Sequence, residues 1–203
     1  NSSRSALLQA LSTYKNANNQ ETTTRADYVG GLVGRNGKNA VLTWDNEANT
    51  VQIGAVICGN DYVGGLVGYN DADGTIDVDY TLIGGSVFAS GDCAGGLAGL
   101  NASTTLLGQT LTVKPASVQG RYYVGGAIGA NVVDPDTDIT VGSLRVDNSL
   151  GSVTAEAFCG GLIGYQRTYT EKDRADRALY ALLPGIAENG DNVPGAVTAS
   201  TNP

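Results

Sequence analysis

Short apolar runs broken by turn-forming residues characterise the chain between residues 30 and 164. Val, Ile, Thr, Tyr and Leu gather in runs of a few residues, and Gly, Asn and Asp separate these runs. No stretch of the interval keeps the i, i+3, i+4 apolar spacing of a helix. One period, for example, contains runs at 62–69, 75–82 and 86–89 with turn signals between them. The pattern predicts three short strands and three corners in each period.

A ten-residue phrase returns five times along these runs. Its copies are DYVGGLVGRN, DYVGGLVGYN, DCAGGLAGLN, YYVGGAIGAN and AFCGGLIGYQ, which begin at Asp27, Asp61, Asp92, Tyr122 and Ala157. The copies lie 30 to 35 residues apart, a period typical of folds in which similar units stack on their neighbours. We therefore predict an all-β fold: a right-handed parallel β-helix (β-solenoid) of about five coils, with three strands per coil and coils about 4.8 Å apart.

Stacking places like residues side by side, so each position of the phrase predicts a ladder of side chains. An aromatic ladder interrupted by one cysteine is expected from Tyr28, Tyr62, Cys93, Tyr123 and Phe158. The last glycine of each copy is expected to bend the chain or to adopt positive φ, and the corner asparagine to join an internal amide stack. Gln166 takes the asparagine position in the last copy. The predicted structural residues are Gly30, Gly31, Gly34, Asn36, Gly64, Gly65, Gly68, Asn70, Gly95, Gly96, Gly99, Asn101, Gly125, Gly126, Gly129, Asn131, Gly160, Gly161 and Gly164.

The core of the phrase, G-L-(bulky apolar)-G, resembles the GLUG-motif repeat family. It stands as GLVG at 31–34 and 65–68 and as GLIG at 161–164, with weaker copies at 96–99 and 126–129. Five registered copies carry the resemblance, which covers residues 27 to 166. It implies a large secreted or surface-attached bacterial protein, such as an adhesin-like molecule or an immunoglobulin A metallopeptidase. The family has no catalytic residues of its own to transfer to this chain.

The two ends of the chain differ from the repeats. Residues 3–16 carry apolar side chains at helical spacing, and residues 171–183 carry a second apolar stripe before Pro184-Gly185. We expect a short helix at each end, covering the strand edges of the terminal coils. The predicted organisation is an N-terminal capping helix and lead-in (1–26), a GLUG-like β-solenoid (27–169), and a C-terminal helix with a Gly/Pro-rich tail (170–203).

Charge and composition narrow the choice of partners and of compartment. The formal net charge is −8 and only 12 Lys and Arg are present, which argues against nucleic acid and anionic membranes as partners. No apolar run reaches the length of a membrane span, so no membrane insertion is expected. The chain begins at Asn1 without Met, and we interpret it as a processed product or a piece of a longer protein. The expected location is extracellular or at the cell surface.

Alternating acidic residues are the one candidate for a metal site. Asp71 and Asp73 follow the second copy of the phrase, and Asp134, Asp136 and Asp138 follow the fourth. Both runs have the alternate-residue spacing of calcium loops. Neither run continues to the bidentate Glu that such a loop needs, because the twelfth positions are Leu82 and Arg145. We expect solvated acidic corners and no cofactor, with calcium as the alternative.

Other polar groups are assigned structural roles. Asp27, Asp61 and Asp92 share one phrase position and are expected to cap N–H groups of turns rather than to collect cations. The chain has no histidine, and its three cysteines lack a CxxC spacing. We expect Cys58, Cys93 and Cys159 to be reduced and largely buried.

The sequence therefore favours a non-catalytic structural or adhesive segment of a secreted or surface-anchored bacterial protein. The expected partners are neighbouring domains or subunits that stack on the solenoid ends, and a host protein or glycan. One alternative is an accessory module of a large surface metallopeptidase. A second is a polysaccharide-active β-helix enzyme, which would bring several carboxylates and a basic residue together on one face.

Overall fold

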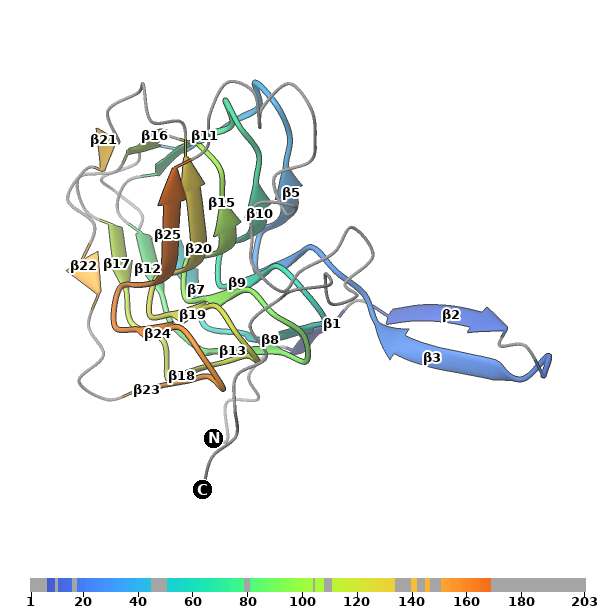
Figure 1. Ribbon diagram of the computed structural model, residues 1–203. Coiled ribbons are helices and arrows are strands. Elements are labelled where there is room, and N and C mark those ends of the chain that lie inside the picture. Colours follow the sequence, from blue (N-terminus) through green and yellow to red (C-terminus); the bar gives the residue numbers. More distant parts are fainter. Residues whose placement is uncertain are drawn as a thin grey trace, which may run out of the picture.

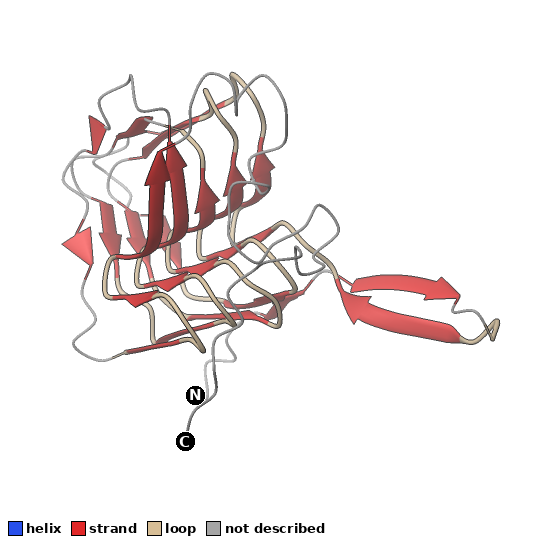
Figure 2. Ribbon diagram, in the orientation of Figure 1, coloured by secondary structure: helices blue, strands red, loops and turns tan. Residues whose placement is uncertain are grey.

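The fold consists of short β-strands stacked in parallel as a β-solenoid (Figure 1). All elements in the described part of the chain are strands (Figure 2), and no helix there is long and apolar enough to cross a membrane. The predicted all-β solenoid is thus confirmed. The computed structural model describes residues 7–9, 11–15, 18–44, 51–78, 81–103, 105–107, 111–133, 140–141, 145–146 and 151–168.

In the described residues, each of the first four repeats contributes five short strands, not the three that the sequence predicts, and the fifth contributes β24 (Cys159–Gly160) and β25 (Ile163–Thr168). In the second repeat the five are β9 (Val63–Gly64), β10 (Val67–Asn70), β11 (Thr75–Val78), β12 (Thr81–Ile83) and β13 (Ser86–Ala89). The first predicted run is divided because the chain bends at the residues between β9 and β10. The second run is likewise divided between β11 and β12. Only β13 corresponds to a whole predicted strand.

Strands at the same position of successive repeats pair to form five parallel sheets. The β4–β24 sheet contains β4 (Val29–Gly30), β9, β14 (Ala94–Gly95), β19 (Val124–Gly125) and β24 (Cys159–Gly160). The β5–β25 sheet contains β5 (Val33–Asn36), β10, β15 (Ala98–Asn101), β20 (Ile128–Val133) and β25 (Ile163–Thr168). Two four-stranded sheets follow. The first contains β6 (Val41–Trp44), β11, β16 (Thr105–Leu107) and β21 (Thr140–Val141). The second contains β7 (Val51–Ile53), β12, β17 (Leu111–Val113) and β22 (Arg145–Val146). The β1–β23 sheet contains β1 (Leu7–Gln9), which precedes the repeats, and the last strand of each of the first four repeats: β8 (Val56–Gly59), β13, β18 (Ser117–Gln119) and β23 (Ser152–Thr154).

The register places corresponding phrase residues opposite one another, as predicted. Gly64 pairs with Gly95, and Asn70 pairs with both Asn36 and Asn101. Because side chains alternate along a strand, neighbouring residues of β10 face different apolar clusters. Val67 belongs to the cluster that contains Leu66, Ile76 and Leu97, whereas Tyr69 belongs to the cluster that contains Tyr62, Cys93 and Tyr123. The β5–β25 sheet is therefore covered on both faces.

A third apolar cluster joins the β4–β24 and β1–β23 sheets. It includes Val63, Ala94 and Val124 from the former and Ile57, Val87 and Val118 from the latter. In β13 the inward residues Val87 and Ala89 are buried, while Ser86 and Phe88 are only partly covered. This alternation gives the β1–β23 sheet a buried inner face and a partly exposed outer face.

The N-terminal helix predicted over residues 3–16 is wrong in the part of it that is described. β1 lies in this segment and pairs in parallel with Val56–Cys58, so it extends the β1–β23 sheet past the first repeat. β2 (Leu11–Lys15) forms an antiparallel hairpin with β3 (Glu21–Arg25), which points away from the stack in Figure 1. Without β1, the outer edge of β8 would leave its backbone N–H and C=O groups unpaired. Pairing with this edge favours a strand over the helix that the local apolar spacing predicts. The predicted C-terminal helix at 171–183 lies outside the described residues.

Candidate functional site

The carboxylates of Asp71 and Asp73 form ion pairs with basic side chains of the preceding repeat. Arg35 Nη2 lies 2.8 Å from Asp71 Oδ2, and Lys38 Nζ lies 3.9 Å from Asp73 Oδ2. Asp71 Oδ1 also accepts a hydrogen bond from the Ala72 amide at 3.1 Å. Within the described ranges, His, Cys, Asp and Glu side chains form no group of three suited to a metal ion. The second calcium candidate, at Asp134, Asp136 and Asp138, lies outside those ranges.

Two of the three stacked aspartates, Asp27 and Asp61, cap backbone N–H groups, as predicted, whereas Asp92 accepts from an arginine side chain. Asp27 Oδ1 accepts from the amide of Asp61 at 3.1 Å, and Asp61 Oδ1 accepts from the amide of Asp92 at 2.6 Å. The fourth repeat has Tyr122 at this position, and there Arg121 Nε donates to Asp92 Oδ1 at 3.0 Å. Each carboxylate therefore fastens the next repeat along the stack.

Burial dominates the electrostatics of this ladder. It raises the pKa of Asp61 to about 6, although the Asp92 amide lowers it in part. Burial also raises the pKa of Asp92, and the Arg121 charge and hydrogen bond oppose that rise. Asp92 Oδ2 and the hydroxyl of Tyr123 are buried without a hydrogen-bond partner in the described structure. Desolvation therefore disfavours the charged forms of Asp61 and Asp92 where the aspartate ladder meets the aromatic cluster.

A buried ladder of asparagine amides runs through the β5–β25 sheet. Asn36 Nδ2 donates to Asn70 Oδ1 at 2.8 Å, Asn70 to Asn101 at 2.8 Å, and Asn101 to Asn131 at 2.7 Å. The remaining amide hydrogens reach carbonyl oxygens of the adjoining turns, such as Gly74 O at 3.1 Å. These contacts confirm the predicted internal asparagine stack.

The aromatic ladder forms in two parts, on either side of Cys93. Tyr28 stacks on Tyr62 with ring centroids 5.1 Å apart, and Tyr123 stacks on Phe158 at 5.2 Å. Positive φ occurs at these aromatic positions (Tyr28, Tyr62 and Phe158) and not at the predicted glycines. A Cβ on Gly68 would instead lie 2.5 Å from Gly34 O and 2.6 Å from Tyr62 O, so the close approach of neighbouring repeats requires glycine there.

The two ends of the stack leave corresponding apolar side chains uncovered. Leu66 and Leu97 are fully buried in inner repeats, whereas Leu32 in the first repeat is 52% exposed and Leu162 in the last is 46% exposed. Tyr28 and Phe158, at the ends of the aromatic ladder, are 37% and 41% exposed. Each end therefore presents an interrupted ladder.

All three cysteines are free thiols. Cys58 and Cys93 are buried, as predicted, but Cys159 is exposed. Cys159 occupies the phrase position of Val124, and its repeat is the last of its sheet, so stacking covers it on one side only.

A groove of about 410 Å³ crosses the outer face of the β1–β23 sheet near the end of β3. Cys58, Phe88 and Gln119 stand opposite one another on neighbouring strands and line its floor. The remaining side chains that the site uses come from the chain just after the strands and from the hairpin: Ser90, Arg121, Glu156 and Arg25. The groove thus combines one aromatic ring with hydrogen-bonding groups of both kinds.

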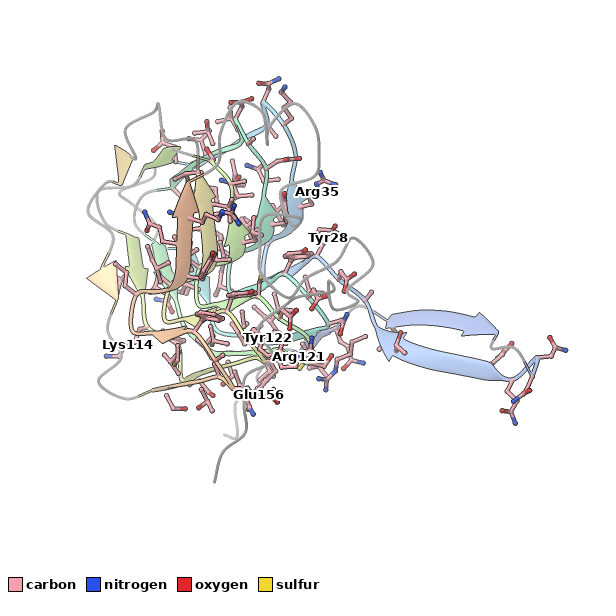
Figure 3. All side chains as sticks on the ribbon, viewed as in Figure 1. Tyr28, Arg35, Lys114, Arg121, Tyr122 and Glu156 are labelled. Atoms are coloured by element: carbon pink, nitrogen blue, oxygen red, sulfur yellow. The ribbon has the colours of Figure 1, made fainter. Side chains whose placement is uncertain are left out.

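Arg121 is held in place by two contacts. Its Nε lies 3.0 Å from Asp92 Oδ1, and its guanidinium carbon lies 4.5 Å from the centroid of the Tyr122 ring. Figure 3 shows Arg121, Tyr122 and Glu156 grouped at one corner of the stack, apart from Arg35 and Tyr28. A guanidinium fixed in this way presents its other N–H groups at low entropic cost.

None of the groove residues was identified as a site from the sequence. Arg25, Phe88 and Arg121 lie outside the repeated phrase, and they are remote from one another along the chain. One signal was available: Phe88 occupies an outward position between inward Val87 and Ala89 in a predicted strand. Only the stacking of repeats shows that the other groups surround it.

The protein is thus a parallel β-solenoid whose β1–β23 sheet carries a groove with polar side chains around one aromatic ring. No protein-family model matches the chain, and no curated protein or solved structure matches it either.

Proposed function

We propose that this chain is a structural and adhesive, non-catalytic β-solenoid segment of a secreted or surface-anchored bacterial protein of the GLUG-repeat kind. Its solenoid is a right-handed β-helix of about five coils, since parallel crossovers are right-handed in about 98% of cases. The five registered phrases and the three polar and aromatic ladders support this role. They join each repeat to the next along one axis, as a spacer or stalk requires.

The uncovered ladder ends carry the proposal. Leu32 and Leu162 share one phrase position, and in the inner repeats a leucine at that position is fully buried. Another solenoid end placed against either leucine would bury it as an inner repeat does. Neighbouring domains or subunits therefore stack on the two ends, and for this chain alone the available neighbour is a second copy. First-to-last contacts of this type form chains and not closed dimers.

Two charged substitutions test the end-stacking. In sedimentation experiments over a wide concentration range, the unaltered chain should self-associate. Leu32→Asp or Leu162→Asp should each reduce this association, because a carboxylate at the interface costs desolvation. An equimolar mixture of the two variants should form dimers and nothing larger, since each variant keeps one intact end.

Ala116→Asp supplies the matched control, because Ala116 is an exposed residue of an inner repeat. This variant should associate like the unaltered chain, and circular dichroism should show that all three variants are folded. An unaltered chain that stays monomeric at every concentration would contradict end-stacking. So would a mixture of Leu32→Asp and Leu162→Asp that stays monomeric.

The composition of the groove supports binding over catalysis. The polysaccharide-active alternative calls for several carboxylates and a basic residue on one face. Among its described lining residues, the groove carries one carboxylate, Glu156, with Arg25 and Arg121. A hydrolase of the usual type needs a pair of carboxylates across the scissile bond.

A further inference from the structure

We propose that the groove on the β1–β23 sheet binds a neutral saccharide, with Phe88 as the stacking surface. This inference rests on the adhesive role proposed above and names its ligand class and its residues. The groove lies on the side of the stack, so saccharide binding does not require association at the ends.

The shape and the floor of the groove suit a sugar ring. Its volume of about 410 Å³ lies within the range of small-ligand sites, roughly 300 to 1,000 Å³. Phe88 is half-buried and stands between Cys58 and Gln119 on the neighbouring strands. A pyranose has an apolar face of C–H groups, which packs against an aromatic ring and loses little hydration in doing so.

The polar groups around Phe88 match vicinal hydroxyls, which both donate and accept hydrogen bonds. Arg25 and Arg121 donate, Glu156 accepts, and the Gln119 amide does both. The Ser90 hydroxyl lies 3.3 Å from Gly59 O and 3.2 Å from Asn60 Oδ1, so its one hydrogen can be donated to either oxygen and its lone pairs remain as acceptors. A ligand with acceptors alone or donors alone would leave some of these groups unsatisfied.

The charges around the groove favour a neutral ligand over an acidic one. Arg121 is paired with buried Asp92 at 3.0 Å, and the charge of Glu156 offsets that of Arg25. These four formal charges sum to zero, so a carboxylated sugar finds no net positive charge, while the chain as a whole carries −8.

The backbone of the sheet argues against an extended peptide. β8, β13 and β18 use their backbone groups in parallel pairing with one another. The groove lies across the face of these strands and not along a free edge, so a peptide cannot add as a further strand there. Recognition depends on side chains, as it does for a saccharide.

Fluorine NMR provides a direct test, because the chain contains two phenylalanines. Incorporation of 4-fluorophenylalanine yields one signal from Phe88 and one from Phe158, assigned with Phe88→Tyr and Phe158→Tyr. Titration of the full chain with glucose, galactose, mannose, N-acetylglucosamine, lactose and maltose should shift the Phe88 signal with at least one of them. The Phe158 signal should stay unchanged and serves as an internal control.

Variants separate the stacking surface from a general effect. Phe88→Ala should weaken binding of the active sugar, measured by calorimetry, by about tenfold, whereas Phe88→Tyr should retain it. Glu156→Gln should weaken binding by a smaller factor, and Phe158→Ala should leave it unchanged. The Leu32→Asp variant should bind like the unaltered chain, so failure of end-stacking and failure of this inference are distinguishable.

Three results would overturn the proposal. The first is a Phe88 signal that no neutral sugar moves. The second is preferential binding of glucuronate or of an acidic peptide over every neutral sugar. The third is sugar binding that survives Phe88→Ala unchanged.

Discussion

The inner and terminal repeats of this solenoid use the same residues with different results. A leucine of the phrase is fully covered in the second and third repeats but about half exposed in the first and last. Tyr62 and Tyr123 are buried, whereas Tyr28 and Phe158, their stacking partners at the ends, are not. The difference shows that a repeat obtains its core from its neighbours and only partly from itself.

The polar ladders show the same contrast. Asn70 and Asn101 each have an amide neighbour on both sides, but Gln166 in the last repeat is exposed. The aspartate ladder ends earlier, where Arg121 replaces a backbone amide as the donor to Asp92. The cost of a substitution should therefore depend on the place of its repeat in the stack.

The largest expected effect comes from crowding between inner repeats. Gly68→Ala places a Cβ 2.5 Å from Gly34 O and 2.7 Å from Val29 N, all backbone atoms of the preceding repeat. We expect a loss of about 4 kcal/mol or more in the free energy of unfolding, measured with urea. Gly37→Ala is the control, because a Cβ there meets no atom within 4 Å. Equal stability of the two variants would refute the close packing of repeats.

The leucine ladder tests the contrast between repeats directly. Leu97→Ala removes a fully buried side chain and should cost about 2–5 kcal/mol in urea unfolding. Leu32→Ala changes the same phrase position at the exposed end and should cost less than about 1 kcal/mol. Both measurements belong at low protein concentration, where association at the ends is minimal. Similar costs would mean that Leu32 is covered as well as Leu97.

Asp61 supplies a pH-dependent comparison. Burial raises its pKa from 3.8 to about 6 in the folded chain, so folding favours the protonated form. Its contribution to stability is complete below about pH 4 and is lost as the pH rises towards 6 and above. Asp61→Asn keeps an oxygen for the Asp92 amide and removes the buried charge. We expect this variant to gain about 1–3 kcal/mol over the unaltered chain at pH 7.5.

The gain from Asp61→Asn should shrink as the pH falls towards 4, and urea unfolding at several pH values measures it. Asp27→Asn, the exposed member of the same ladder, is the matched control. A constant difference between Asp61→Asn and the unaltered chain at all pH values would contradict the assignment of the raised pKa to Asp61.

The smallest effect concerns chemistry and not stability. Cys159 in the last repeat is exposed, whereas Cys58 and Cys93 are buried. Iodoacetamide should modify Cys159 in the native chain at a rate near that of a free thiol, and the other two only after denaturation. Mass spectrometry after timed quenching counts the modified thiols, and Cys159→Ser removes the fast phase. Rapid native labelling of Cys93 would show that the aromatic ladder is open.

The sequence permitted most of the architecture to be predicted, because the phrase repeats in register. Spacing alone located the glycine positions and the internal stack of Asn36, Asn70, Asn101 and Asn131. It failed at the N-terminus, where Leu7 and Leu11 have helical spacing but lie in strands. It also assigned positive φ to the corner glycines, whereas the left-handed backbone falls on Tyr28 and Tyr62. Both failures involve contacts with other repeats that a local pattern does not contain.

The sequence by itself determined the stacking, the ladders and the all-β class, since identical residues at a constant period can satisfy their packing only against one another. The tertiary structure alone decided which copies are buried and which side chains meet in the groove. Arg25 lies in the hairpin, Phe88 and Glu156 lie in different repeats, and the three obey no common spacing. Parallel stacking brings Phe88 and Glu156 to the same side of the β1–β23 sheet, and the hairpin adds Arg25 beside them.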